Sequence, residues 1–171
     1  MIPKKRLECS SEGDRDFSAH YAWVEVFGFN KPIEYHYQMS KMFDLGTVNG
    51  VKGVIGPMKT TKLAKGRKPV KVKVGNFILP VRFLSQWYKL LWLKYLDANP
   101  DLVRYASQFD EFTDKFRGKS QNCQADVIRQ YVKEGRESIL KDCEELWTLL
   151  KMKQQEEKES VAIFDAFGFD N

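Results

Sequence analysis

RFLSQWYKLLWLKYL, residues 82–96, is the most strongly patterned stretch of the 171-residue chain. Its apolar side chains recur every three or four positions, which is the spacing of a helix that buries one face. They are Phe83, Leu84, Trp87, Leu90, Leu91 and Tyr95. A proline disfavours helical backbone at the residue before it, so this helix is predicted to end before Asn99-Pro100.

Further helices are predicted after this one. A short helix is expected to open at Asp101. Beyond a polar stretch, Ser120 or Asn122 is expected to cap another helix, because such side chains accept hydrogen bonds from the first free backbone N–H groups. Gly135 should interrupt that helix, and a last helix is predicted from about Glu137 to Lys153, where apolar residues again have core spacing.

The residues before position 82 predict a more mixed structure. Apolar and polar residues alternate at Val24-Glu25-Val26, which indicates a short strand. Asn30-Lys31-Pro32 is typical of a helix start, and a helix is predicted over residues 33–43. Residues 44–76 are rich in glycine and are expected to be loop, with a short strand at Val70–Val74. The fold class predicted is α+β, as a mostly helical single domain with a small β-sheet.

Composition limits the class of protein. Hydrophobic residues make up 43% of the chain and aromatic residues 13%, which excludes an intrinsically disordered protein. The apolar runs are too short or too charged for the roughly 20 residues of a membrane span, so no membrane contact is expected. The first residues, MIPKKRLE, lack the apolar segment of a signal peptide. Three cysteines without a C-x-x-C pair indicate reduced thiols, and the predicted location is cytoplasmic.

Motifs for metals and cofactors are missing from the sequence. With two histidines and no cysteine cluster, no metal site is expected, and the zinc-deaminase pattern is missing as well. The chain has no Walker A motif and no G-x-G-x-x-G, so no bound cofactor is expected. It also lacks the G-x-S-x-G of serine hydrolases. Any chemistry is left to carboxylates, amides and basic residues, in a protein expected to be a monomer.

Charge is distributed unevenly along the chain. Residues 51–75, the basic block, contain eight Lys or Arg residues and no Asp or Glu. Such density is typical of a site for a polyanion, and a solvated surface loop is the alternative. The candidate nucleic-acid-binding residues within it are Lys65, Lys68, Lys71 and Lys73, together with Arg67.

The opposite bias lies at the C-terminus. Residues 154–171, the acidic tail, contain five acidic residues and one lysine, with Phe164, Phe167 and Phe169 among them. This segment is predicted to be a flexible extension of a domain that covers residues 1–153. Three interpretations remain open: the tail folds back on the basic surface, recruits a protein partner, or is a disordered end.

Two polar clusters are candidates for chemistry. Glu34, Gln38 and Lys41 share one face of the predicted helix, where a carboxylate can act at a glycosidic carbon, an amide can bind sugar hydroxyls and a lysine can bind phosphate. An exposed helix face is the alternative. The second cluster, residues 110–122, precedes a predicted helix start, where free backbone N–H groups bind phosphate. An ordinary loop with its helix cap explains it equally well.

The order of these pieces resembles the NADAR superfamily, whose bacterial type member is the YbiA-like N-glycosidase. Asp16-Phe17-Ser18 is similar to the start of the family's D-F-S-N-F segment, and residues 34–42 keep the Glu, Gln and Lys of its E-H-Y-x-Q-x-x-K-F helix. Gly66-Arg67 resembles a family G-R pair, and the helix containing Trp87 resembles the next segment. Residues 110–125 loosely resemble D-x-x-W-G…G-K-N-x-L-G, with Asp110 matched to its first position.

The resemblance implies hydrolysis of an N-glycosidic bond. Family members release sugar phosphates from riboflavin-pathway intermediates or remove ADP-ribose from modified nucleobases, including guanine in DNA. Because a small-molecule hydrolase does not need the basic block, we expect ADP-ribosylated DNA or nucleoside as the substrate. Such an enzyme would reverse toxin-type ADP-ribosylation of DNA, in a bacterium or a phage. The alternatives are a non-enzymatic nucleic-acid-binding protein and the riboflavin-intermediate N-glycosidase.

The resemblance also implies a role for each matched residue. Glu34 would be the catalytic carboxylate, and Asp110 a second carboxylate or a group that positions ribose or water. The ADP-ribose ligands would include the amides of Gln38 and Asn122 and the hydroxyl of Ser18. The pyrophosphate would be bound by Lys41, Arg67 and Lys119. Phe17 or Trp87 would stack on adenine.

Overall fold

The structure is a computed structural model that describes residues 3–48, 51–55, 66–115 and 123–166. Its helices are α1 (Ile33–Ser40), α2 (Leu84–Asp97), α3 (Pro100–Ala106), α4 (Gln124–Arg129), α5 (Arg136–Asp142) and α6 (Glu144–Ala166). Its strands are β1 (Arg6–Glu8), β2 (Trp23–Val26), β3 (Phe29–Pro32), β4 (Lys41–Val48), β5 (Val51–Ile55), β6 (Lys71–Val74), β7 (Phe77–Pro80) and β8 (Glu111–Thr113). The α+β class predicted from the sequence is confirmed.

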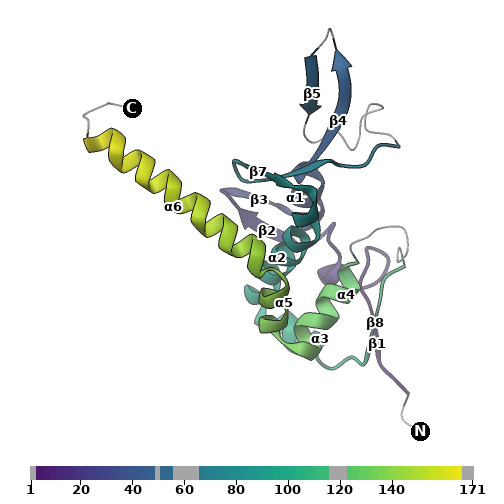
Figure 1. The fold of residues 1–171 in the computed structure, drawn as a ribbon. Helices are drawn as coiled ribbons and strands as arrows, with labels where there is room; N and C mark the ends of the chain where they lie inside the picture. Colours follow the sequence, from purple (N-terminus) through teal and green to yellow (C-terminus); the bar gives the residue numbers. More distant parts are fainter. Residues whose placement is uncertain (1–2, 49–50, 56–65, 116–122, 167–171) are drawn as a thin grey trace.

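Helix α2 lies at the centre of the molecule, as Figure 1 shows. Half of its residues are buried, and Trp92 and Leu96 have no exposed surface. A helix buried over such a wide arc must be packed on several sides. Helices α1, α3, α4 and α5 and the strand β2 all contact α2, which therefore forms the middle of the core. The predicted helix end before Asn99-Pro100 and the short helix after it are confirmed.

The strands form three small sheets (Figure 1). Strands β2 and β3 form an antiparallel hairpin. Four antiparallel strands form the second sheet in the order β5-β4-β6-β7. Strand β8 pairs in parallel with β1 from the beginning of the chain. Two of the predicted strands are confirmed, because β2 covers Val24–Val26 and β6 begins one residue after Val70.

The loop prediction for residues 44–76 was wrong in part. Helix α1 ends at Ser40, three residues earlier than predicted, and Lys41 opens strand β4. Strand β4 pairs with β5, with Val48 opposite Val51. The signal for this hairpin was Asn49-Gly50, a dipeptide that favours a two-residue hairpin turn between apolar residues. The lysines and glycines on either side of this dipeptide favoured a loop instead, so the hairpin was not predicted.

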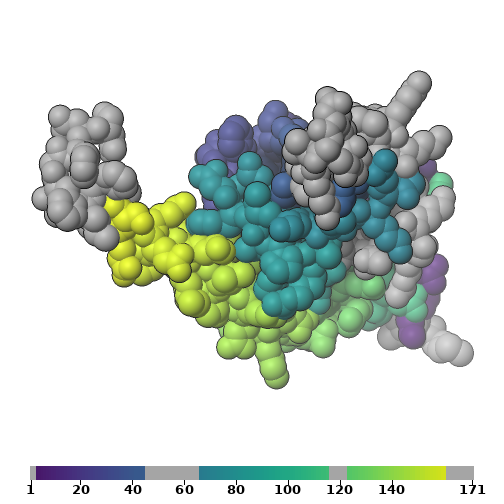
Figure 2. Space-filling model, turned by 45° about the horizontal axis from the view of Figure 1, so that its top comes forward, coloured from purple at the N-terminus to yellow at the C-terminus, as the bar shows by residue number. Residues whose placement is uncertain are grey.

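The predicted last helix is two helices, separated at Cys143. The predicted end near Lys153 was wrong, because α6 continues to Ala166. Gln, Glu and Lys are good helix formers, and neither glycine nor proline occurs between Glu144 and Gly168. The far end of α6 stands away from the rest of the protein in Figures 1 and 2. Whether a domain boundary lies at Lys153 stays a prediction.

The polar stretch before α4 also differs from its prediction. Residues Glu111–Thr113 form strand β8, held by ladder bonds to β1. Helix α4 begins after Cys123, which is its N-cap and makes no side-chain cap hydrogen bond. The expected cap by Ser120 or Asn122 is therefore corrected. Gly135 ends the helical segment with a φ of 95°, as its position predicted.

Candidate functional site

Glu34 and Gln38 form a hydrogen-bonded pair on α1. Nε2 of Gln38 donates to Oε1 of Glu34 over 2.8 Å, which fixes the orientation of both side chains. Both residues are half-buried. The remaining amide oxygen of Gln38 is buried and has no hydrogen-bond partner among the described residues. Since a buried polar atom without a partner costs free energy, this oxygen is a candidate acceptor for a ligand hydroxyl or amine.

Helix α1 is fixed to distant segments by hydrogen bonds. The backbone N–H of Glu34 donates to the carbonyl of Ala19 over 2.9 Å. The N–H of Ala19 donates to Oε1 of Gln124, over 2.7 Å, and Nε2 of Gln124 donates to the carbonyl of Cys9, over 2.6 Å. The buried Gln124 side chain thereby joins three segments beside Glu34. Ser18 lies in one of these segments.

Aromatic side chains extend the site from α1 to α2. The ring of Tyr37 meets the ring of Tyr88 edge-on, with 4.9 Å between their centroids. Nζ of Lys41 lies 4.5 Å from the centroid of Tyr37, within range of a cation–π contact. Lys41 belongs to a strand rather than to the helix, so its predicted place on the helix face of Glu34 and Gln38 is corrected to a place beside Tyr37.

Tyr88 connects the two sides of the site electrostatically. Burial raises the pKa of its hydroxyl, and the negative charges of Glu34 and Asp114 raise that pKa further. Two carboxylates from different segments therefore contribute to the pKa of the same buried hydroxyl. Sγ of Cys123 lies 3.8 Å from Oδ2 of Asp114. At neutral pH Tyr88 stays protonated and can donate a hydrogen bond.

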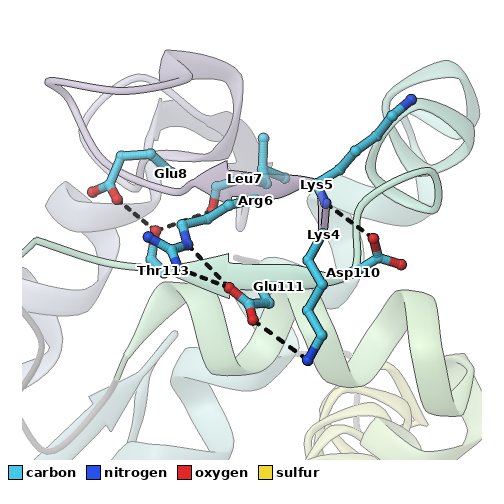
Figure 3. A network of polar contacts seen from close by, with 8 residues as sticks. All are labelled: Lys4, Lys5, Arg6, Leu7, Glu8, Asp110, Glu111 and Thr113. Carbon is cyan, nitrogen blue, oxygen red and sulfur yellow. Dashed lines mark hydrogen bonds and ion pairs between the residues drawn. The ribbon is translucent and has the colours of Figure 1, made fainter. Parts of the chain in front are cut away.

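Asp110, predicted to be the second carboxylate, immediately precedes strand β8. Its Oδ2 accepts a hydrogen bond of 3.0 Å from the backbone N–H of Lys5, within the polar network of β1 and β8 in Figure 3. Asp114 follows the other end of β8, which pairs with the residues leading to Cys9. Four residues of near-extended chain separate the two Asp residues by about 10–13 Å. Asp114 is the carboxylate of this segment that raises the pKa of Tyr88.

Of the two residues proposed to stack on adenine, Phe17 is corrected and Trp87 stays a prediction. Phe17 is fully buried and packs against Tyr105 at a centroid distance of 6.1 Å, so neither face of its ring is open to a ligand. Trp87 stacks on Phe27 at 6.1 Å and lines cavities that do not include Glu34. The α2 residue on the side of Glu34 is its neighbour Tyr88.

The remaining predicted ligands have different surroundings. Ser18 is fully buried beside Ala19, and its hydroxyl has no partner among the described residues. Arg67 is exposed and donates to the carbonyl of Asp44 over 2.8 Å. Lys119 and Asn122 lie outside the described residues, so their predicted roles stay predictions. Of these ligands, only Ser18 is tied by described contacts to the segments around Glu34.

The basic block is described only in part. Lys65 lies outside the described residues, and Lys68, Lys71 and Lys73 are all exposed. Lys71 and Lys73 alternate with the buried Val72 and Val74 along β6, so one side of this strand is basic. Both lysines are thus available to an anionic partner.

Two further findings concern metals and membranes. Over residues 3–48, 51–55, 66–115 and 123–166, no three His, Cys, Asp or Glu side chains gather as a metal site. In that same part of the chain, no helix has the length and apolar character needed to cross a bilayer.

Tyr88 and Asp114 are the site residues that sequence reasoning missed. No local sequence signal singled out Asp114, because its position depends on the pairing of β8 with β1. For Tyr88 the periodicity of α2 was not sufficient, because the helix is apolar on nearly all sides.

Comparison with known proteins adds no assignment. No protein-family model matches the sequence, and no curated protein matches it.

Proposed function

We propose that the protein is an N-glycosidase that removes ADP-ribose from modified nucleobases, with DNA as the carrier of the base. The observation that carries this proposal is the hydrogen-bonded Glu34–Gln38 pair on α1. The carboxylate of Glu34, like that of Asp114, raises the pKa of the buried Tyr88 hydroxyl. N-glycosidic cleavage develops positive charge on the ribose ring and needs a carboxylate near the anomeric carbon. Two carboxylates from different segments meet that need.

Each group has a distinct role in the proposed reaction. Glu34 stabilises the oxocarbenium-like transition state or removes a proton from the attacking water. Gln38 holds Glu34 in place through its amide N–H, and its free amide oxygen accepts from a ribose hydroxyl. Asp114 accepts from a second ribose hydroxyl, and Tyr88 donates a hydrogen bond. Lys41, beside Tyr37, pairs with a phosphate.

The choice of DNA as carrier depends on the exposed cations. Arg67, Lys68, Lys71 and Lys73 are all exposed and follow one another within a few residues of the same chain segment. A free nucleotide does not need so many cations, whereas a DNA backbone presents phosphates at regular intervals. The proposed substrate is therefore a modified base that is still part of a DNA chain.

The proposal is tested by incubating the protein with an ADP-ribosylated DNA oligonucleotide and measuring free ADP-ribose. Glu34→Gln keeps the size and the hydrogen bond to Gln38 but removes the charge, so turnover should fall by at least about 100-fold. Glu156→Gln, the same change at an exposed position of α6, is the matched control and should leave turnover unchanged. Wild-type turnover in a folded Glu34→Gln variant would remove Glu34 from the mechanism.

Binding separates this activity from a DNA-binding protein without catalysis. ADP-ribose should raise the melting temperature of the wild-type protein, because a ligand that binds only the folded state stabilises it. A protein that only binds DNA should not respond to ADP-ribose.

A further inference from the structure

A groove lined by aromatic residues lies on the side of α1 that faces away from Glu34. It comprises a cavity of about 470 Å³ between the β2–β3 hairpin, α1, the β6–β7 turn and α6. Its lining includes Phe27, Phe29, Tyr35, Trp87 and Lys73. A second cavity of about 650 Å³ under α6 shares Phe27 and Trp87 in its lining, so the two cavities adjoin. Neither includes Glu34, and the groove is separate from the candidate hydrolytic site.

The groove contains three large aromatic side chains that are about half exposed or more. Phe29 is 65% exposed, Phe27 50% and Tyr35 43%. Apolar rings scattered singly over a surface are ordinary, but three that line one cavity mark a binding surface. An exposed aromatic ring can stack against a planar ligand.

The backbone holds one of these rings in place. Phe27 has a φ of 51°, in the left-handed region that bulky residues rarely adopt. Its ring stacks on Trp87, and a Cβ at Gly75 would come within 3.0 Å of it. Gly75 thus leaves space for the ring at the turn that follows β6. Strained residues concentrate at functional sites, and this one lies in the floor of the groove.

Cations surround the aromatic rings. Lys73 lines the cavity, and Nζ of Lys31 lies 5.3 Å from the centroid of Tyr35. Nζ of Lys153 lies 5.5 Å from the centroid of Phe77, at the same turn. One carboxylate in the lining, Glu157, comes from the projecting part of α6. Strand β6 also carries Lys71, so the described part of the basic block leads directly into the groove.

We propose that this groove binds single-stranded DNA, with unpaired bases stacked on Phe29 and Tyr35 and backbone phosphates paired with Lys31 and Lys73. Open aromatic faces among cations are the arrangement that binds single strands without sequence preference. In a duplex the base faces are covered by neighbouring base pairs and cannot reach these rings. The inference goes beyond the proposed hydrolysis and does not depend on it, because unmodified DNA should bind as well.

The test measures the dissociation constant of a fluorescein-labelled dT20 oligonucleotide by anisotropy at low salt. Phe29→Ala and Tyr35→Ala should each weaken binding by about fivefold or more, as expected for the loss of one stacked base. Trp23→Ala is the matched control. Trp23 is also about half exposed, but side chains alternate along β2, so Trp23 points to the opposite side from Val26, which lines the groove. Its removal should change affinity by less than about twofold.

Lys73→Gln gives an independent measurement. It should reduce the slope of log affinity against log salt by about one, since one phosphate contact is lost. A duplex of the same length should bind less tightly and should be insensitive to Phe29→Ala. Glu34→Gln should bind dT20 like the wild type, so a failure of the proposed hydrolysis would not affect this result.

Photocrosslinking of the unaltered protein covers the case in which a variant does not fold. An oligonucleotide with 5-iodouracil should crosslink to Phe29 or Tyr35. Crosslinks confined to other segments, equal losses with Trp23→Ala and Phe29→Ala, or no binding of dT20 would each overturn the proposal. An unaltered affinity in both aromatic variants would indicate that the groove has another occupant, such as a protein segment.

Discussion

Replacing the buried Gln124 with alanine is the perturbation whose effect can be worked out most fully. This side chain satisfies two backbone groups at once, the N–H of Ala19 and the carbonyl of Cys9. Both residues are buried, with exposed fractions of 2% and 0%. In Gln124→Ala neither group has a replacement among the described residues.

The expected loss follows from the cost of unsatisfied buried groups, about 1–3 kcal/mol each. Two groups give about 2–6 kcal/mol, and a water molecule entering the vacated space favours the lower half of that range. For a chain of this size, each kcal/mol lowers the melting temperature by about 2–4 °C, so a fall of about 5–15 °C is expected. Urea unfolding followed by circular dichroism measures the loss directly.

Two further variants separate the hydrogen bonds from the lost volume. Gln155→Ala, on the exposed side of α6, should change the free energy of unfolding by less than about 0.5 kcal/mol. Gln124→Glu keeps the volume and the acceptor for Ala19 but turns a carboxylate oxygen towards the carbonyl of Cys9. That contact raises the folded-state pKa above the usual value of about 4.3, so the stability of this variant should be retained at low pH and lost as pH rises. A loss below 1 kcal/mol in Gln124→Ala would refute the reasoning.

Three other outcomes are expected. Truncation after Lys153 should lower the melting temperature by only a few degrees, because the side chains of residues 154–160 are exposed. A drop above about 10 °C in differential scanning fluorimetry would show that this segment belongs to the core. The guanidinium of Arg136 lowers the pKa of Asp97, so Arg136→Gln should reduce the free energy of unfolding most near neutral pH and less as pH falls below about 4. Urea titrations measure this loss, and a loss that does not change with pH would contradict the prediction. ADP-ribose release should survive EDTA, and a loss that zinc or magnesium restores would show that a metal site had been missed.

The sequence predicted best the parts of the fold where local pattern and burial agree. The apolar period of residues 84–97 and the proline at position 100 specified α2 and its end, because both act within a few residues. The alternation around Val72 specified β6 in the same way. The end of α6 was misplaced because its polar residues have strong helix propensity but give no apolar period.

The site depended on contacts that no local pattern contains. The pair Glu34 and Gln38 was predictable, since a spacing of four residues places both on one helix face. Asp114 reaches the site only because β8 pairs in parallel with β1, more than 100 residues earlier in the chain. Pairing at that separation decides which end of a three-residue strand points to Glu34. The sequence alone therefore did not separate Asp110 from Asp114.

The central claim is tested most directly by comparing two matched variants. The quantity measured is the rate at which each variant releases ADP-ribose from an ADP-ribosylated DNA oligonucleotide. Asp114→Ala, which removes the proposed acceptor for a ribose hydroxyl, should slow release by about tenfold or more, whereas Asp110→Ala, the same change about 10–13 Å away on the other end of β8, should alter it by less than about threefold. Equal effects of the two variants, the reverse order, or no release by the folded wild-type protein would contradict the account.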